Sequence, residues 1–571
     1  MPRSLRASTC PTATGTSATG TSATLTTALV AAAILLTLST GAVAAEPPTS
    51  FSQATTPLAL VDARLAPEVD IAALRAEDAS KDRQPGPTRF AAAAQAGWSL
   101  DSTGTWEELA DGSKLWRLRL ASPGALSLSV ALADLELPTG AKLWLYATET
   151  GDGVRGPYGA SDVHNGTLFT PVVLGDSAVL ELWIPAGDTA SLRVDAVHHG
   201  YRFFGEREKQ GPCNIDIVCP QADDWREQAA AVGTYSINGI FLCTGTMMNN
   251  TAQDFAPYFL TADHCGLGPN NVSSLVVYWN YESPTCGALS GGSLNDNQLG
   301  ASFVSGSGRS DFTLLRLNNS PDPTFGVTYA GWDARGAVPQ AVTAIHHPGT
   351  DEKAISFEND PVTSLDLLGS GTEDFWRVAD WDVGTTEPGS SGSCIFDQTS
   401  KLCVGTLTGG LAACGNDLED WYGKFSQHWV GEGTSSTRLS DWLDPGNTGA
   451  LFLESTSGCP NGALCLRGGR FQVSVDWRDF DGNTGIGQIV TQSDDSGLLW
   501  FFGPDNWELL VKIIDGCSLT NTFWVFSAAT TDVEYTLTVT DTQESVSKTY
   551  SNPLGRAAPA INDTGAFATC P

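Results

Sequence analysis

The stretch that decides the fold reads PGSSGS at residues 388–393, a pair of serines held between glycines. Two upstream segments belong with it, YFLTADHC at 258–265 and SDFTLL at 310–315. They place a histidine, an aspartate and a serine in that order, within a region of short apolar runs and many Gly and Asn turns. Such a region is typical of an all-β fold, and the order of the three residues indicates a serine hydrolase.

Each of the three residues suits one task in the hydrolysis of an amide. His264 has a side chain whose ordinary pKa lies near neutrality, so it would take the proton of the nucleophile. Asp311 opens an apolar run and would orient the imidazole. Ser391 would attack the carbonyl carbon, and the amides of Gly389 and Ser391 would form an oxyanion hole. We therefore predict a catalytic triad of His264, Asp311 and Ser391 that works through an acyl-enzyme.

Each piece taken alone has a simpler explanation. A Gly-Ser string is commonly a linker or turn, a His beside a Cys is commonly structural, and an Asp before a strand is commonly a turn residue. Their conjunction in one cysteine-rich β region favours catalysis. An α/β-hydrolase is disfavoured, because those enzymes order their triad Ser, Asp, His and use Gly-x-Ser-x-Gly, whereas Ser393 stands at the last glycine position.

Composition bounds the class of protein. A chain of 571 residues is long enough for two to four domains. Its 41% hydrophobic and 17% charged residues indicate a globular protein, and its net charge of −33 argues against nucleic acid or an anionic membrane as a partner. There is no Cys-x₂-Cys or HExxH motif, so we predict neither a metal nor a cofactor.

The N-terminus indicates export. Arg3 and Arg6 precede a mostly apolar run at 28–45 that ends in small residues, which predicts a signal peptide over residues 1–45. A membrane anchor is the competing interpretation, since the run is long enough to span a bilayer, but no basic stop-transfer cluster follows it. We expect a secreted protein, a monomer, with no stable membrane association after cleavage.

The cysteines agree with an oxidising compartment. Of the 13 in the chain, Cys10 lies in the signal region, eight fall between Cys213 and Cys414, and four fall between Cys459 and Cys570. Two even sets in two stretches predict two disulfide-bonded domains. The pairing of the last four has three possibilities, which the sequence leaves open.

The remaining segments read as further β domains. Residues 46 to about 90 have weak periodicity and predict a loose leader. Alternating apolar runs at 115–120, 126–130 and 179–184 predict a first β-rich domain that contains no cysteine. Residues 456–571 predict a β-sandwich-like third unit, in which the aromatic runs are core and the Asp-Gly pair at 481–482 is a hairpin turn rather than a calcium site.

The central stretch, from Cys213 to about Gly449, resembles bacterial lysyl endopeptidase, a secreted trypsin-like protease. The similarity is dense at CNIDIVCP (213–220), VYWNY (277–281), AIHHP (344–348), TEPGSSGS (386–393) and RLSDWLDP (438–445). The resemblance implies a double β-barrel over 210–455 with its active site between the barrels. It also implies an N-terminal pro-domain over 46–209. The triad that it implies is the same one, His264, Asp311 and Ser391.

The resemblance also implies a set of disulfides and a substrate class. The family's bridges would fall on Cys213–Cys414, Cys219–Cys286 and Cys243–Cys265. Cys394 and Cys403 lie outside that pattern, and their spacing suits a hairpin, so we predict a fourth bridge between them. The family cleaves polypeptides after lysine.

In that family an aspartate in the specificity pocket selects the lysine, and Asp420 is the matching residue. The alternative is that Asp420 is an exposed loop residue, since Asp417 and Glu419 flank it. The family's Trp and His beside the pocket match Leu368 and Thr408 here. Because that aromatic pair is missing, we predict cleavage after Lys or after both Lys and Arg.

The charged linker before the central domain offers a processing site. Lys209 lies four residues before Cys213, close to where the family's mature enzymes begin. Self-cleavage there would free the central domain from its pro-domain. For the first domain, the alternative is an independent carbohydrate- or protein-binding module. For the whole chain, the alternative is a secreted binding or adhesion protein that carries a degenerate protease fold.

Overall fold

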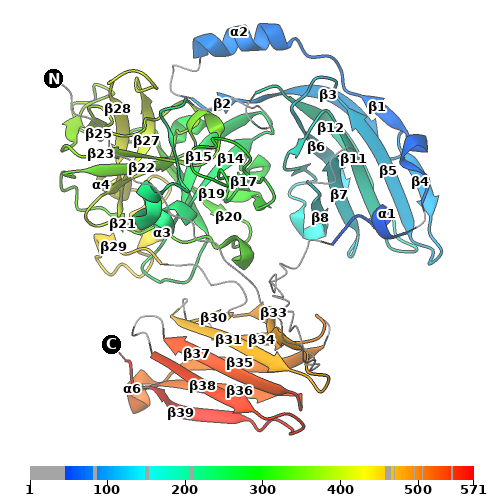
Figure 1. Cartoon of the computed structure of the whole chain (residues 1–571). Coiled ribbons are helices and arrows are strands. Elements are labelled where there is room, and N and C mark those ends of the chain that lie inside the picture. Colours follow the sequence, from blue (N-terminus) through cyan, green and yellow to red (C-terminus); the bar gives the residue numbers. More distant parts are fainter. Residues whose placement is uncertain are drawn as a thin grey trace, which may run out of the picture. The chain divides into compact units, whose positions relative to one another are not determined.

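The computed structural model describes most of the chain after the predicted signal peptide (Figure 1). The described residues are 46–53, 55–81, 86–147, 153–202, 204, 211–456, 464–467, 470–493, 495–504, 506–541, 544 and 546–570. The signal peptide at 1–45 and Lys209 lie outside them. The predicted boundary between 209 and 210 also lies outside them, and the one at 455–456 lies at the edge of a described stretch, so both stay predictions.

The N-terminal unit is built from two sheets that enclose one core. The first contains β1 (Ala63–Leu65), β5 (Lys114–Ala121), β11 (Ser177–Ile184), β7 (Lys142–Ala147) and β8 (Arg155–Tyr158), with β4 (Thr105–Glu108) beside β5. The second contains β10 (Val173–Leu174), β6 (Ser127–Glu136), β12 (Ser191–Gly200) and β3 (Ala91–Ser99), with β9 (Leu168–Phe169) beside β6. Leu118 and Leu180 from one sheet share a buried cluster with Val130 and Val194 from the other. The three strands predicted from alternating runs are confirmed.

The leader is better ordered than its sequence suggests. It contains α1 (Thr49–Ser52) and an 11-residue helix, α2 (Ile71–Lys81). Asp78 on α2 is buried and accepts hydrogen bonds from Arg89 and from the hydroxyl of Tyr201. A buried ion pair rather than an apolar stripe therefore holds this helix, which is why periodicity failed to reveal it.

The central unit consists of two mainly antiparallel sheets. One contains β18 (Asn297–Leu299), β17 (Val276–Tyr278), β14 (Val232–Ile237), β15 (Phe241–Met248), β16 (Tyr258–Thr261), β20 (Phe312–Leu317) and β19 (Ala301–Ser307), with the short β2 (Thr88–Arg89) paired to β15. The other contains β13 (Ile215–Asp216), β23 (Ala354–Glu358), β22 (Val342–His346), β26 (Cys394–Asp397), β27 (Cys403–Gly410), β28 (Asp420–Lys424), β25 (Phe375–Val378) and β24 (Thr363–Leu365), with β21 (Trp332–Asp333) and β29 (Phe452–Leu453). Three short helices accompany them: α3 (Arg226–Ala230), α4 (Phe425–Val430) and α5 (Ser440–Leu443).

The C-terminal unit is likewise built from two sheets, each of five strands. One contains β30 (Leu464–Leu466), β31 (Phe471–Arg478), β37 (Glu534–Asp541), β38 (Val546–Asn552) and β32 (Thr484–Ile486). The other contains β33 (Gln488–Gln492), β34 (Ser496–Trp500), β35 (Trp507–Asp515), β36 (Phe523–Ala529) and β39 (Ile561–Phe567). Along β37 every second residue is buried, as its alternating sequence predicts. Phe501 and Phe523 lie in the core, which confirms the interpretation of the aromatic runs as largely structural.

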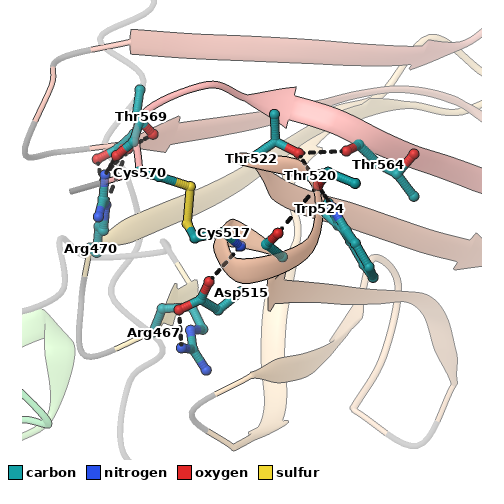
Figure 2. The surroundings of a disulfide bond; sticks show 12 residues. Arg467, Arg470, Asp515, Cys517, Thr520, Thr522, Trp524, Thr564, Thr569 and Cys570 are labelled. Atoms are coloured by element: carbon teal, nitrogen blue, oxygen red, sulfur yellow. Dashed lines mark hydrogen bonds and ion pairs between the residues drawn. A yellow bond between two sulfur atoms is a disulfide. The ribbon is translucent and has the colours of Figure 1, made fainter.

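A disulfide closes the chain's C-terminal end (Figure 2). Cys517 on the short helix α6 (Cys517–Thr520) is bonded to Cys570, and Cys465 is also disulfide-bonded. The neighbouring Arg470 donates hydrogen bonds to Asp541 and to the carbonyl of Thr569, which further anchors the end of the chain. This pairing is one of the three that the sequence left open.

All three units are therefore built on β-sheets, and the prediction of an all-β, multidomain fold is confirmed. Among the helices of the described residues, none is long and apolar enough to cross a membrane.

Candidate active site

Two neighbouring strands bring His264 and Asp311 together. His264 lies in a short 3₁₀ turn just after β16, and Asp311 lies just before β20. These strands pair antiparallel with Thr261 opposite Thr313, so the end of one meets the start of the other. The Nδ1 atom of His264 lies 2.7 Å from Oδ2 of Asp311, and the backbone amide of His264 donates to Oδ1 at 2.9 Å. This geometry assigns the ring proton to Nδ1 and leaves Nε2 as the basic nitrogen.

The Asp311 carboxylate is buried but ionised. Burial raises the pKa of Asp311, whereas the hydrogen bonds and charge of His264 lower it, and the net result is a pKa below the ordinary value. The hydroxyl of Thr408 lies beside the same carboxylate. Asp311 also has a φ of 62°, in the left-handed region that Asp tolerates better than most residues. The turn thus holds a charged acceptor against the imidazole.

Ser391 lies where the two sheets of the central unit meet. Its carbonyl oxygen accepts a hydrogen bond from the amide of Thr244 on β15, and the next amide, of Gly392, donates to Leu407 on β27. The Sγ atom of Cys265 lies 3.9 Å from the same Ser391 carbonyl oxygen. Because residue 265 directly follows His264, the serine backbone lies next to the segment that carries the imidazole.

The structure records no hydrogen bond between the Ser391 hydroxyl and His264. In the part of the chain that it describes, Nε2 of His264 is buried and has no hydrogen-bond partner. Catalytic hydrogen bonds are often long in the absence of substrate and shorten when it binds. The unpartnered Nε2 is available to take a proton.

The turn before β26 leaves two amides free. Over the described residues, the amides of Ser390, Gly392 and Ser393 all donate to backbone carbonyls, whereas those of Gly389 and Ser391 donate to none. Gly389 has a φ of +101°, and a Cβ there would lie 2.7 Å from the amide nitrogen of Thr350, so only glycine fits. Two free amides on residues 389 and 391 are what a developing oxyanion requires.

Asp420 is a buried carboxylate with one oxygen unsatisfied. It lies at the start of β28 with 1% of its surface exposed, which excludes the exposed-loop alternative. Its Oδ2 atom accepts hydrogen bonds from Nε1 of Trp381 and from the hydroxyl of Thr386, both at 2.7 Å. Its Oδ1 atom is buried without a hydrogen-bond partner among the described residues. Burial raises the pKa of Asp420 to about 6, against the hydrogen bonds from Thr386, from Trp381 and from the backbone of Ala412, which lower it.

The two other residues predicted to line the specificity pocket, Leu368 and Thr408, lie on different segments of the chain. Leu368 is in the loop between β24 and β25 with 57% of its surface exposed. A β-bulge between Leu407 and Gly409 interrupts the pairing of β27 with β28, and Thr408, at the bulge, lies beside Asp311. Sequence matching missed Trp381 and Thr386, whose side chains donate hydrogen bonds to Asp420.

Four disulfides stabilise the central unit. They are Cys213–Cys414, Cys219–Cys286, Cys243–Cys265 and Cys394–Cys403. The last one crosses the hairpin of β26 and β27, where the spacing had placed it. Cys243–Cys265 links β15 to the turn that carries His264. Within the described residues there is no group of three or more His, Cys, Asp or Glu side chains that could hold a metal ion.

Comparison with known proteins agrees with this geometry. Residues 60–200 match the family model for the lysyl endopeptidase N-terminal domain, and residues 207–423 match the one for the lysyl endopeptidase C-terminal domain. A lysyl endopeptidase of Pseudomonas aeruginosa is 29% identical over 357 residues, which cover 56% of this chain and 75% of the relative. The fold is all-β and multidomain, and these matches support the class of proteases. More specifically, the chain is a lysyl endopeptidase-like protein.

Proposed function

We propose that the protein is a serine endopeptidase in which His264, Asp311 and Ser391 form the catalytic triad. The observation that carries the proposal is the His264–Asp311 pair, with its free Nε2, beside a serine whose turn offers two unused amides. A base, an orienting carboxylate and oxyanion donors are the three requirements of acyl transfer by serine.

In the proposed reaction, Nε2 of His264 takes the proton of the Ser391 hydroxyl while Oγ bonds to the carbonyl carbon of the substrate. The electron pair of the C=O bond moves to the oxygen, which the amides of Gly389 and Ser391 stabilise. His264 then gives its proton to the leaving amine as the C–N bond breaks. Water attacks the acyl-enzyme in the same way and frees Ser391.

We further propose that Asp420 selects lysine at the residue before the scissile bond. Thr386, which holds the carboxylate, lies five residues before Ser391 on the same loop, and β28 pairs with β27 beside it. Among the described residues Oδ1 of Asp420 has no hydrogen-bond partner, so it is the oxygen that we assign to a guest. A lysine ammonium is a point charge that one oxygen can satisfy, whereas the arginine fork is best matched by two, so this arrangement favours Lys over Arg.

The proposal extends to export and processing. The enzyme would be secreted through the signal peptide at 1–45, and cleavage after Lys209 would release the pro-domain. β2, which lies before Lys209, pairs with Phe241 and Leu242 of β15, so the uncleaved leader supplies one strand to the central sheet. N-terminal sequencing of the secreted protein and of a Ser391→Ala variant tests self-cleavage; identical processing in both would exclude it.

The central test combines a label with a digest. A fluorophosphonate probe should modify the processed protein at Ser391 and not the Ser391→Ala variant, which should also lose casein hydrolysis. Mass spectrometry of a digested protein mixture should show cuts after lysine. Absence of both labelling and cleavage would instead support the alternative, a binding protein with a degenerate protease fold.

A further inference from the structure

Thr244, on β15, holds the turn that carries the two free amides. It is fully buried. Its hydroxyl donates to the carbonyl of Gly389 at 2.9 Å, and its backbone amide donates to the carbonyl of Ser391 at 2.9 Å. Its own carbonyl oxygen packs closely against Gly392: a Cβ added to Gly392 would lie only 2.4 Å from that oxygen. One residue therefore touches the turn with its side chain, its amide and its carbonyl.

The two carbonyls that Thr244 holds belong to particular peptide planes. The plane joining residues 389 and 390 has its oxygen on Thr244, and its N–H, that of Ser390, donates to Glu387. The plane joining residues 391 and 392 has its oxygen on Thr244, and its N–H donates to Leu407. Both planes are thus fixed at both ends. The planes that contain the free N–H groups of Gly389 and Ser391 directly precede them, so their rotation is restricted by rigid neighbours.

Thr244 is itself held firmly. The hydroxyl of Thr261 donates to its carbonyl at 2.8 Å, and the same hydroxyl lies 2.7 Å from the hydroxyl of Tyr235. The preceding residue, Cys243, is bonded to Cys265, which follows His264. One short piece of β15 therefore connects the segment of the base to the turn of the oxyanion donors.

We infer that Thr244 is a positioning residue that keeps the amides of Gly389 and Ser391 aimed at the oxyanion. Its hydroxyl is the critical group, since among the described residues it is the hydrogen-bond donor to the carbonyl of the peptide plane after Gly389. This inference rests on the proposed serine protease function and deepens it. Loss of the Thr244 hydroxyl should therefore lower kcat more than it raises KM, because a misaimed donor weakens binding of the transition state more than binding of the substrate. Loss of a threonine with a merely structural role would not produce this pattern.

The test compares Thr244→Val with a matched control. Valine keeps the shape and the backbone amide but removes the hydroxyl. Loss of a whole oxyanion donor costs about 10²–10³ in rate, so misaiming one should lower kcat by about 10- to 100-fold with KM changed by less than about 2-fold. Thr246→Val, two residues on in the same buried strand, removes a hydroxyl that accepts only a 3.4 Å contact from the amide of Cys394, and it should leave kcat within about 2-fold.

Three further measurements sharpen the result. Thr244→Ser keeps the hydroxyl and should recover most of kcat, whereas Thr244→Ala should lose as much kcat as Thr244→Val. If the valine variant folds poorly, the alanine variant takes its place in the test. A peptide aldehyde ending in lysinal places an oxyanion in the site when Ser391 adds to it, so its Ki should rise in parallel with the loss of kcat. The Ki of a simple lysine amide, which is not an oxyanion, should stay constant.

The outcomes separate the two proposals. If Ser391→Ala retains casein hydrolysis, the proposed function fails. If Ser391→Ala is inactive while Thr244→Val keeps wild-type kcat, or loses kcat and aldehyde binding no more than Thr246→Val does, the positioning role of Thr244 is overturned and the function stands.

Discussion

Replacing Asp420 with asparagine should make the protein more stable and less active at the same time. The substitution keeps the shape of the side chain and removes the charge. Its amide oxygen can take the place of Oδ2 and accept from Trp381 and Thr386, while its NH₂ replaces the unpartnered Oδ1. A stability gain combined with a loss of function is typical of a charge that is kept for binding.

The magnitude follows from the pKa. Burial raises the pKa of Asp420 from the ordinary value of 3.8 to about 6 in the folded protein, which corresponds to about 3 kcal/mol. This penalty acts on the folded wild type above pH 6 and vanishes below about pH 4, where the carboxyl is protonated in both states. Burying an unpaired NH₂ costs about 1–2 kcal/mol in return, so the net gain at pH 8 should be about 1–2 kcal/mol.

The assay is urea unfolding in a Ser391→Ala background, which prevents self-digestion, at pH 8 and pH 4 with the disulfides intact. In the active background, removing one partner of a buried ion pair should lower kcat/KM for lysyl substrates by at least about 10²-fold. Asp417→Asn, an exposed neighbour with the same change of charge, is the control and should alter neither quantity. An Asp420→Asn variant that cleaves lysyl substrates as well as the wild type would refute the assignment of Asp420.

Other expected outcomes follow from the same geometry. The KM of lysyl substrates should rise about tenfold per pH unit below about pH 6, because the cation needs the ionised form of Asp420; a flat KM down to pH 5 in initial-rate assays would contradict this. Trp381→Phe removes one of the two hydrogen bonds to Oδ2 and should raise KM by about 5- to 20-fold, with Ser391 labelling by a fluorophosphonate unchanged. Asp311→Asn should lower kcat by about 10⁴-fold, because the amide no longer fixes the ring proton on Nδ1; a loss below tenfold would argue against the triad. Replacing both Cys394 and Cys403 with alanine should lower the free energy of unfolding by about 2–3 kcal/mol, measured by urea denaturation at neutral pH.

The sequence predicted the residues that combine unusual chemistry with a fixed order. His264, Asp311 and Ser391 were selected because three separate segments, each ambiguous, had to be explained together, and the structure places the first two in hydrogen-bond contact. The strands of the flanking units were found because their residues alternate between core and solvent, as along β37. The hairpin disulfide was predicted because Cys394 and Cys403 lie outside the family's disulfide pattern and their spacing suits a hairpin.

What could not be predicted depends on contacts between distant segments. Trp381 and Thr386 reach Asp420 from 39 and 34 residues away, and no local pattern reveals such hydrogen bonds. The bulge at Thr408 shifts the pairing of β27 with β28 by one residue, and a sequence alignment does not show such a shift. The helix α2 escaped detection because its anchor, Asp78, is a buried charge, and patterns of hydrophobicity report only apolar burial.

The bond between Cys517 and Cys570 has a consequence for an enzyme that cuts after lysine. Lys548, on β38, lies between the two cysteines, and its ammonium is paired with Asp563 at 2.7 Å. A neighbouring copy that severed the chain after Lys548 would leave both fragments tethered through sulfur, so the nicked module would stay in one piece. The disulfide thus keeps the C-terminal module covalently intact after a cut at Lys548.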